Sequence, residues 1–201
     1  MKRILFIILL LSSLVFGRKI VVKLATLATE GTDWHGMLID MGQEWKKTTK
    51  GTVQLRIYPG GVLGDERDMV RKMRIGQIHA AGITTEGLSE IVPDFSGFFV
   101  PMAFQTSEDV HTVVAALLPN LETKLDSNGF KLLCLVNMGW AYWFSTNQIK
   151  TPDDLKKMKI FSWAGDYKWE HVWKNSGYDP IALAATDILP GFQTGLINTL
   201  S

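Results

Sequence analysis

Residues 52–82 read "TVQLRIYPGGVLGDERDMVRKMRIGQIHAAG" and carry the pattern from which the fold class can be inferred. At their start Val53, Leu55 and Ile57 alternate with Gln54, Arg56 and Tyr58, which is typical of a half-buried strand. Residues 65–75 then place apolar side chains at helical spacing behind an acidic first turn, and this favours a helix. The following "IHAAGIT" is typical of a short buried strand. Strand, loop, helix and strand form the crossover unit of a parallel sheet and predict an α/β fold.

The glycine cluster inside this unit has two interpretations, a phosphate-binding loop or a structural turn. Gly60, Gly61 and Gly64 match neither the G-x-G-x-x-G pattern of dinucleotide sites nor the P-loop pattern. Acidic residues follow where a phosphate would lie. We therefore predict that Pro59 and the two glycines after it form a turn, and that Gly64 starts the helix.

The rest of the chain continues to alternate strands with helices. Further strands are predicted at 19–28, 130–139 and 159–165, of which "FKLLCLVNMG" at 130–139 is expected to be buried. Helices are predicted after three caps: Thr32-Asp33, Ser107, and Thr151 with Pro152 and a capping box closed by Asp154. The apolar faces expected to point inward are Trp34, Met37, Leu38, Met41 and Trp45 in the first helix and Val110, Val113, Val114 and Leu117 in the second.

The N-terminus has the features of an export signal. Lys2 and Arg3 precede the apolar run 4–11, and Gly17 offers a small residue for cleavage. We predict that residues 1–17 are a signal peptide and that the mature protein is periplasmic; the alternative is an uncleaved N-terminal anchor. Removing Lys2 and Arg3 from the 21 basic side chains leaves 19 against 20 acidic ones, a net charge of −1, so nothing steers the protein toward nucleic acid.

No pattern of catalytic or metal-binding residues stands out. The four histidines have no zinc-site spacing, no nucleophile motif occurs, and Cys134 lies inside an apolar run where it is expected to be a small buried hydrophobe. The acid pairs 65–66, 108–109 and 153–154 all fall at predicted helix starts, where capping and the helix dipole explain them. The sequence therefore predicts no metal, no cofactor and no enzymatic activity.

Aromatic residues are unusually dense between positions 140 and 173. Core packing uses only some of them, and the rest suit a pocket lined by apolar and aromatic surface. They are Trp140, Tyr142, Trp143, Phe144, Phe161, Trp163, Tyr167, Trp169 and Trp173.

From residue 20 to 201 the chain resembles the solute-binding proteins of tripartite ATP-independent periplasmic (TRAP) transporters, the DctP type or solute-binding protein family 7. The most specific piece runs from "YPGGVLGDERDMVRKMRIGQ" to "VPMAF", with its Pro-Gly turn, Leu-Gly, acidic helix start and closing proline. The segments "TPDDLKKMKI" and "GFQTGLIN" resemble the family's Pro-Glu-Asp-Leu-Lys-Gly and Gln-x-Gly-x-x-Asp segments.

This resemblance implies a two-lobed periplasmic-binding-protein-like fold that closes over a small organic solute and delivers it to membrane permease subunits. The lobe boundary is predicted near Gly139, with residues 18–139 as the first lobe and 140–201 as the second. Because family members are longer, we expect the second lobe to be truncated in this chain. A secreted enzyme and a sensory binding protein of the same fold are the alternatives.

Site residues are predicted from the carboxyl ends of the parallel strands, where such sheets bind ligands. They are Glu30, Trp34, Thr84, Thr85, Trp143, Phe161 and Trp163. The resemblance also implies a carboxylate-binding arginine in the pattern Lys-Ile-Arg, but this sequence has Phe161 there, and "WAYWFS" lacks the second arginine of many members. We therefore expect a solute with an apolar part; in the alternative, Phe161 packs into the core and another cation reaches the solute.

Overall fold

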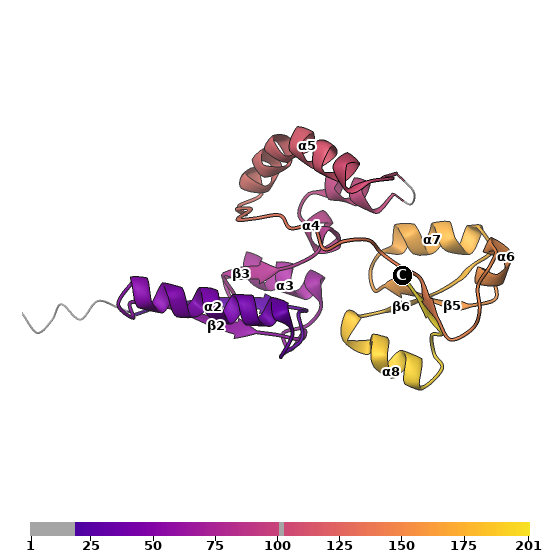
Figure 1. Cartoon of the computed structure of the whole chain (residues 1–201), viewed down its shortest axis with the longest axis horizontal. Coiled ribbons are helices and arrows are strands. Elements are labelled where there is room, and N and C mark those ends of the chain that lie inside the picture. Colours follow the sequence, from indigo (N-terminus) through magenta and orange to yellow (C-terminus); the bar gives the residue numbers. More distant parts are fainter. Residues whose placement is uncertain (1–18, 101–102) are drawn as a thin grey trace, which may run out of the picture. The chain divides into compact units, whose positions relative to one another are not determined.

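The computed structural model describes residues 19–100 and 103–201, so the predicted signal peptide at 1–17 lies outside the described residues. The chain divides into two compact units, each discontinuous in sequence. Figure 1 labels the helices and strands. The first combines residues up to Val62 with Lys72–Gly82, and the second combines Leu63–Arg71 with Ile83–Ser201. The predicted lobe boundary near Gly139 stays a prediction.

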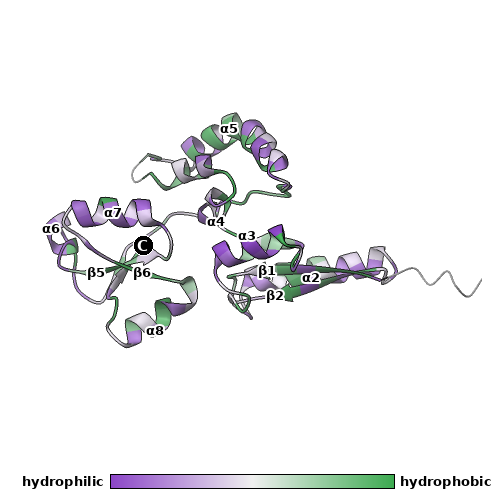
Figure 2. Cartoon of the chain, turned by 180° about the vertical axis from the view of Figure 1, so that it is seen from behind, coloured by the Kyte–Doolittle hydropathy of each residue, from purple (hydrophilic) through white to green (hydrophobic). Residues whose placement is uncertain are grey.

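The first unit contains a parallel three-stranded sheet in the order β2-β1-β3. Its strands are β1 (Ile20–Thr26), β2 (Val53–Tyr58) and β3 (Ala80–Gly82). Leu24 of the central strand is in register with Ile57 on one side and Ala80 on the other. Hydrophobic residues run along β1 (Figure 2), and Leu24 and Ala25 are buried. The parallel arrangement predicted from residues 52–82 is confirmed.

Helix α2 (Asp33–Thr48) follows β1 and begins where the sequence predicts. The Thr32 side chain accepts a hydrogen bond from the backbone N–H of His35 and caps the helix. The predicted apolar face is wrong at Trp34 and Met37, which are 38% and 56% exposed. Because α2 packs mainly against the single edge strand β2, its buried stripe is narrower than the sequence pattern indicates.

The loop between β2 and α3 (Glu66–Arg74) is a structural turn, as predicted. Gly60, Gly61 and Gly64 have φ angles of 61°, 72° and 97°, a region that favours glycine. The N–H of Gly60 donates to the carbonyl of Ala28. The turn after β2 is therefore bonded to the loop that follows β1.

In the second unit, the stretch from Ile83 onward begins with three helices. It contains α4 (Thr85–Ser89), the 3-10 helix η1 (Pro93–Phe99) and α5 (Ser107–Ser127). The cap of α5 is Thr106, in a capping box with Asp109, and not the predicted Ser107. Leu121 and Leu125 are buried. Over the described ranges, no helix is both long and apolar enough to cross a membrane.

The buried strand predicted at 130–139 is wrong. Residues 129–143 have no regular secondary structure, and Leu133 and Met138 are 79% and 71% exposed. Cys134, expected to be buried, is exposed as well. A strand needs a partner for its backbone N–H and C=O groups, and no strand of the described chain pairs with this segment. The apolar run alone does not supply that partner.

The second unit also contains a mixed four-stranded sheet in the order β4-β7-β5-β6. Its elements are β4 (Phe144–Ser145), α6 (Pro152–Leu155), β5 (Lys159–Trp163), α7 (Tyr167–Asn175), β6 (Asp179–Leu183), the 3-10 helix η2 (Ala185–Asp187), α8 (Ile188–Gln193) and β7 (Thr199–Leu200). β5 runs parallel to β6 and β7, while β4 is antiparallel to β7. The predicted α/β class and the capping box of Thr151 with Asp154 are confirmed.

Candidate functional site

The candidate site is built around Glu66, in the first turn of α3. This side chain is only 3% exposed, yet both of its oxygens are bonded. Oε1 accepts from the backbone N–H of Thr84 over 2.8 Å, while Oε2 accepts from the Thr84 hydroxyl over 2.7 Å and from the N–H of Gly87 over 2.9 Å. Glu66 thus anchors the first turn of α4 to α3.

Burial raises the pKa of the Glu66 carboxyl, because desolvation disfavours its charged form. The hydrogen bonds from Thr84 and Gly87 act in the opposite direction. The close approach requires a glycine at position 87, since a Cβ there would lie 2.7 Å from Oε2 of Glu66. The absence of a side chain at Gly87 therefore leaves room for the Glu66 carboxylate.

The two residues flanking Glu66 bind the loops that follow β5 and β6. Oδ2 of Asp65 accepts from the N–H of Ala185 over a long 3.4 Å. Nη2 of Arg67 donates to the carbonyl oxygen of Gly165 over 3.0 Å and to Oε1 of Glu90 over 2.6 Å. β5 and β6 are parallel neighbours, so residues 65–67 meet the carboxyl edge of the second sheet and the start of α4 at once.

Carboxylates dominate the electrostatics of this region. The pKa of Glu86 is raised to about 7, first because burial desolvates it and then because Asp166, Glu66 and Glu90 repel its charge. Arg67 opposes the shift. A solute that carries two carboxylates would meet the same repulsion here.

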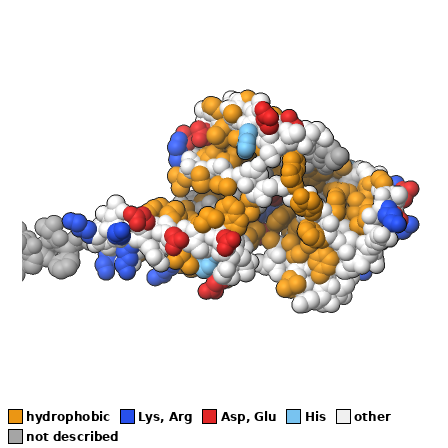
Figure 3. Space-filling model, in the orientation of Figure 1, with side chains coloured by type: hydrophobic (Ala, Val, Ile, Leu, Met, Phe, Trp, Pro, Cys, Tyr) orange, Lys and Arg blue, Asp and Glu red, His pale blue; other side chains and the backbone are white. Residues whose placement is uncertain are grey.

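Two pairs of aromatic side chains pack together in the second unit. The rings of Phe161 and Trp163 lie edge to face with centroids 5.2 Å apart, and Trp143 and Trp173 do the same at 6.0 Å. Phe161 is 8% exposed and belongs to the core, whereas Trp143 is 47% exposed and Trp163 is half-buried. Figure 3 shows other hydrophobic side chains at the surface of the face in view.

The structure brings together some of the predicted site residues. Thr84 and Thr85 lie at the start of α4 beside Glu66, and Phe161 and Trp163 lie at the end of β5. Glu30 and Trp34 are exposed residues of the first unit.

The sequence alone does not identify the long-range contacts of Asp65, Glu66 and Arg67, because acids at a helix start are explained by the helix dipole. A signal was nevertheless present. Glu66 precedes Met69, Val70 and Met73 by three, four and seven residues, which places its carboxylate on the apolar face of the helix. A carboxylate on such a face needs internal donors, and those donors are in α4.

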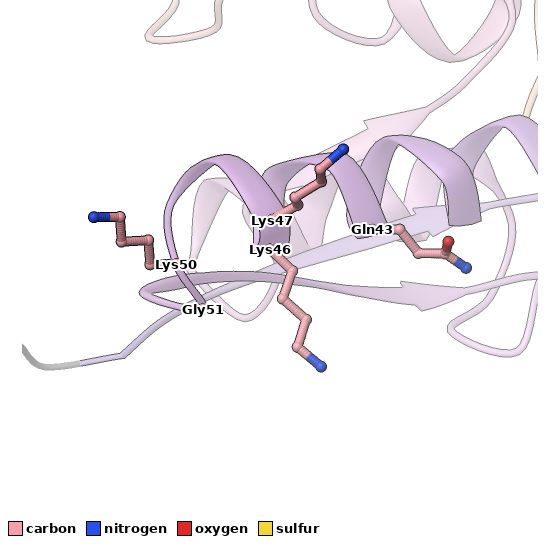
Figure 4. Close-up of a pocket in the computed structure, with 5 residues that line it drawn as sticks. All are labelled: Gln43, Lys46, Lys47, Lys50 and Gly51. Atoms are coloured by element: carbon pink, nitrogen blue, oxygen red, sulfur yellow. The ribbon is translucent and has the colours of Figure 1, made fainter.

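A shallow depression at the end of α2 does not resemble a solute site. It is lined by Gln43, Lys46, Lys47, Lys50 and Gly51. Figure 4 shows the three lysine side chains pointing in different directions, so their ammonium groups do not converge on one ligand. Lysines in the last turn of a helix are also favoured by its dipole.

The histidines of the first unit have structural roles. Nδ1 of His35 accepts from the N–H of Gly31 over 3.3 Å, and Nδ1 of His79 accepts from the N–H of Lys23 over 3.0 Å. Within residues 19–100 and 103–201 no group of three or more His, Cys, Asp or Glu side chains is arranged to hold a metal ion.

Comparison with known proteins identifies the family. The model of the family "Bacterial extracellular solute-binding protein, family 7" (DctP) matches residues 24–200. The chain belongs to this family. A solute-binding protein of Roseobacter denitrificans is 25% identical over 191 residues, which cover 94% of this chain and 58% of that protein.

Solved structures share the fold of this family 7 protein. A TRAP periplasmic solute-binding protein of Citrobacter koseri with bound D-glucuronate has a TM-score of 0.77 and 25% identity, over 90% of this chain and 61% of that one. Another from Sulfurospirillum deleyianum with bound succinate has a TM-score of 0.81 and 18% identity, over 91% and 59%. The chain thus spans less than two thirds of the length of each of these relatives.

Proposed function

We propose that this chain is the solute-binding component of a TRAP-type uptake system, which captures a small organic solute in the periplasm and passes it to membrane permease subunits. It acts by binding and not by catalysis. The family match over residues 24–200 is the observation that carries this proposal. A periplasmic location is supported by the predicted signal peptide and by the solved relatives, which are periplasmic solute-binding proteins.

The proposed solute site lies at the carboxyl edge of the second sheet and the start of α4. The Thr84 hydroxyl already donates to Glu66, so it can offer the solute only an acceptor. Thr85 offers a second hydroxyl group there, and Trp163 and Trp143 are proposed to supply aromatic surface. Glu30 and Trp34, in the first unit, remain proposed solute-site residues. This combination of a few polar groups with aromatic walls is typical of small-molecule sites.

The proposed solute is an organic molecule with an apolar part. Two relatives hold D-glucuronate and succinate, both carboxylates. In this chain, however, Phe161 replaces the expected arginine, the Arg67 guanidinium is bonded to Glu90 and Gly165, and carboxylates crowd the region. A monoanion with an apolar body therefore suits the site better than a small dianion.

Release of bound ligand tests this proposal directly. The protein is purified from the periplasm without a refolding step, denatured, and its released small molecules are identified by mass spectrometry. Recovery of one organic solute near a 1:1 ratio, which rebinds in calorimetric titration, is the expected result. A protein that carries no such molecule, and that binds neither D-glucuronate nor phenylacetate, would contradict the proposed function.

A further inference from the structure

The second compact unit contains a contact between residues almost a hundred positions apart. Nη2 of Arg67, in the first turn of α3, donates to the carbonyl oxygen of Gly165, in the loop between β5 and α7. The same nitrogen donates to Glu90, which follows α4. One guanidinium thus joins α3, the end of α4 and the loop that follows Trp163.

The chain is shaped to permit this contact. A Cβ at position 165 would lie 1.8 Å from Nη1 of Arg67 and 2.3 Å from its Cζ, so the guanidinium occupies the space that any other side chain would need. Gly165 also has a φ of +94°, which L-residues rarely adopt. Two independent constraints therefore require glycine where the arginine rests.

Glu90 holds the guanidinium in place. The Arg67–Glu90 ion pair joins atoms 2.6 Å apart, and the two side chains are 47% and 32% exposed. An exposed pair adds little stability by itself. Its effect here is to orient a planar group that has several donors in a fixed geometry, which a lysine does not offer.

A second contact restrains the neighbouring loop. Asp65, two residues before Arg67, accepts from the N–H of Ala185 just after β6. Loops after two adjacent parallel strands are thereby bonded to one turn of α3. Arg67 provides the shorter of the two contacts, 3.0 Å against 3.4 Å.

We propose that Arg67 is a positioning residue for solute binding: it fixes the loop at Gly165 and, through it, the orientation of Trp163. The solute part of this inference rests on the proposed function. In this proposal Arg67 acts through its Nη2 donors, which bind Glu90 and Gly165, and not by contact with the solute. Its effect on affinity passes through the loop and the indole.

The test compares Arg67→Gln with Arg71→Gln on the same helix, because the ion pair of Arg71 is local, with Asp68 three residues away. Amide hydrogen exchange is followed at residues 163–167, and Trp163 is observed by ¹⁹F NMR of 5-fluorotryptophan protein, assigned with Trp163→Phe. We expect Arg67→Gln to speed exchange in this loop about fivefold and to shift the Trp163 resonance, with Arg71→Gln unchanged.

Calorimetric titration with phenylacetate and D-glucuronate measures the consequence for binding. Affinity for the probe that binds should fall about fivefold in Arg67→Gln, with no comparable fall in Arg71→Gln. Arg67→Lys should restore the charge but not the loop order. Gly165→Ala should resemble Arg67→Gln, and the double variant should be less impaired than the sum of the single ones.

Two results would overturn the proposal. Exchange at 163–167 and the Trp163 resonance could be the same in Arg67→Gln as in the parent protein, which would show that the contact fixes nothing. Alternatively, the loop could loosen without any change in affinity, which would show that its order does not serve binding. If the parent protein binds neither probe and no co-purified solute, the proposed function fails, and the exchange data still decide whether Arg67 fixes the loop.

Discussion

Gly87 and Glu66 are packed so closely that only glycine fits. The N–H of Gly87 donates to Oε2 of Glu66 over 2.9 Å, and a Cβ on Gly87 would lie 2.7 Å from the same oxygen. Both residues are buried. The Glu66 carboxylate accepts from backbone N–H groups at the start of α4, as the side chain of a helix cap usually does. Unlike a usual cap, it lies 18 residues before Thr84 and 21 before Gly87.

Replacement of Glu66 by alanine should destabilise the protein. The buried N–H of Gly87 would lose its acceptor, and an unpaired buried donor costs about 1–3 kcal/mol. We expect a loss of this size in the free energy of unfolding, measured by denaturant titration. The control is Glu108→Ala at an exposed position in the first turn of α5, where little change is expected. Equal stability of the two variants would show that the Glu66 contacts contribute nothing.

Stability should depend on pH through Glu86. Its pKa rises from 4.5 to about 7 on folding, through burial and the neighbouring charges of Asp166, Glu66 and Glu90, with Arg67 opposing. Between these two pH values the folded state binds more protons than the unfolded state. The contribution of Glu86 is therefore greatest at low pH and is lost as the pH rises toward and through 7.

Thermal unfolding at pH values from 5 to 8 measures this effect. We expect the midpoint temperature to fall across the interval and the fall to be smaller in Glu86→Gln. Some slope should remain, because the pKa of Glu66 is also raised. If Glu86→Gln leaves the pH profile as steep as before, the carboxyl of Glu86 does not titrate in this way.

Local patterns in the sequence predict local structure well in this chain. Period-two alternation locates β2 at Val53–Tyr58, and side-chain chemistry identifies the caps Thr32 and Thr151. In each case the decisive interaction lies within a few residues. These features follow from backbone geometry, so one sequence is enough to infer them.

Features that depend on distant partners could not be predicted in the same way. The run around Cys134 has the composition of a buried strand, but no described strand pairs with it, and it is exposed. The candidate site raises the same difficulty. Arg67 is adjacent to Glu66 in sequence, yet its acceptor at Gly165 is set by the fold and leaves no periodic signal.

Two leucines of α5 provide a matched test of how this helix packs. Leu125 is 1% exposed and Leu117 is 47% exposed, whereas the sequence pattern places Leu117 on the inward face. Leu125→Ala should lower the free energy of unfolding by about 2–5 kcal/mol, the usual cost of emptying a core position. Leu117→Ala should cost less than about 1 kcal/mol, because surface substitutions are usually mild. Denaturant titration of both variants measures these free energies of unfolding. A larger loss for Leu117→Ala than for Leu125→Ala would support the inward face predicted from the sequence.

The final prediction concerns the choice of solute. The protein should bind phenylacetate more tightly than succinate, because aromatic surface at Trp163 and Trp143 offers about 25 cal/mol for each Å² of apolar area removed from water. A dianion would instead meet the carboxylates of Glu86 and Asp166, with no arginine at position 161 to offset its desolvation.

Substitutions at the aromatic positions separate contact with the solute from packing. Trp163→Ala should weaken phenylacetate binding in calorimetric titration, since its ring is half-buried and available at the end of β5. Phe161 is 8% exposed, so Phe161→Leu should change stability more than affinity. Tight succinate binding that survives Trp163→Ala, together with no measurable binding of phenylacetate, would show that the solute is held by charged groups and not by this aromatic surface.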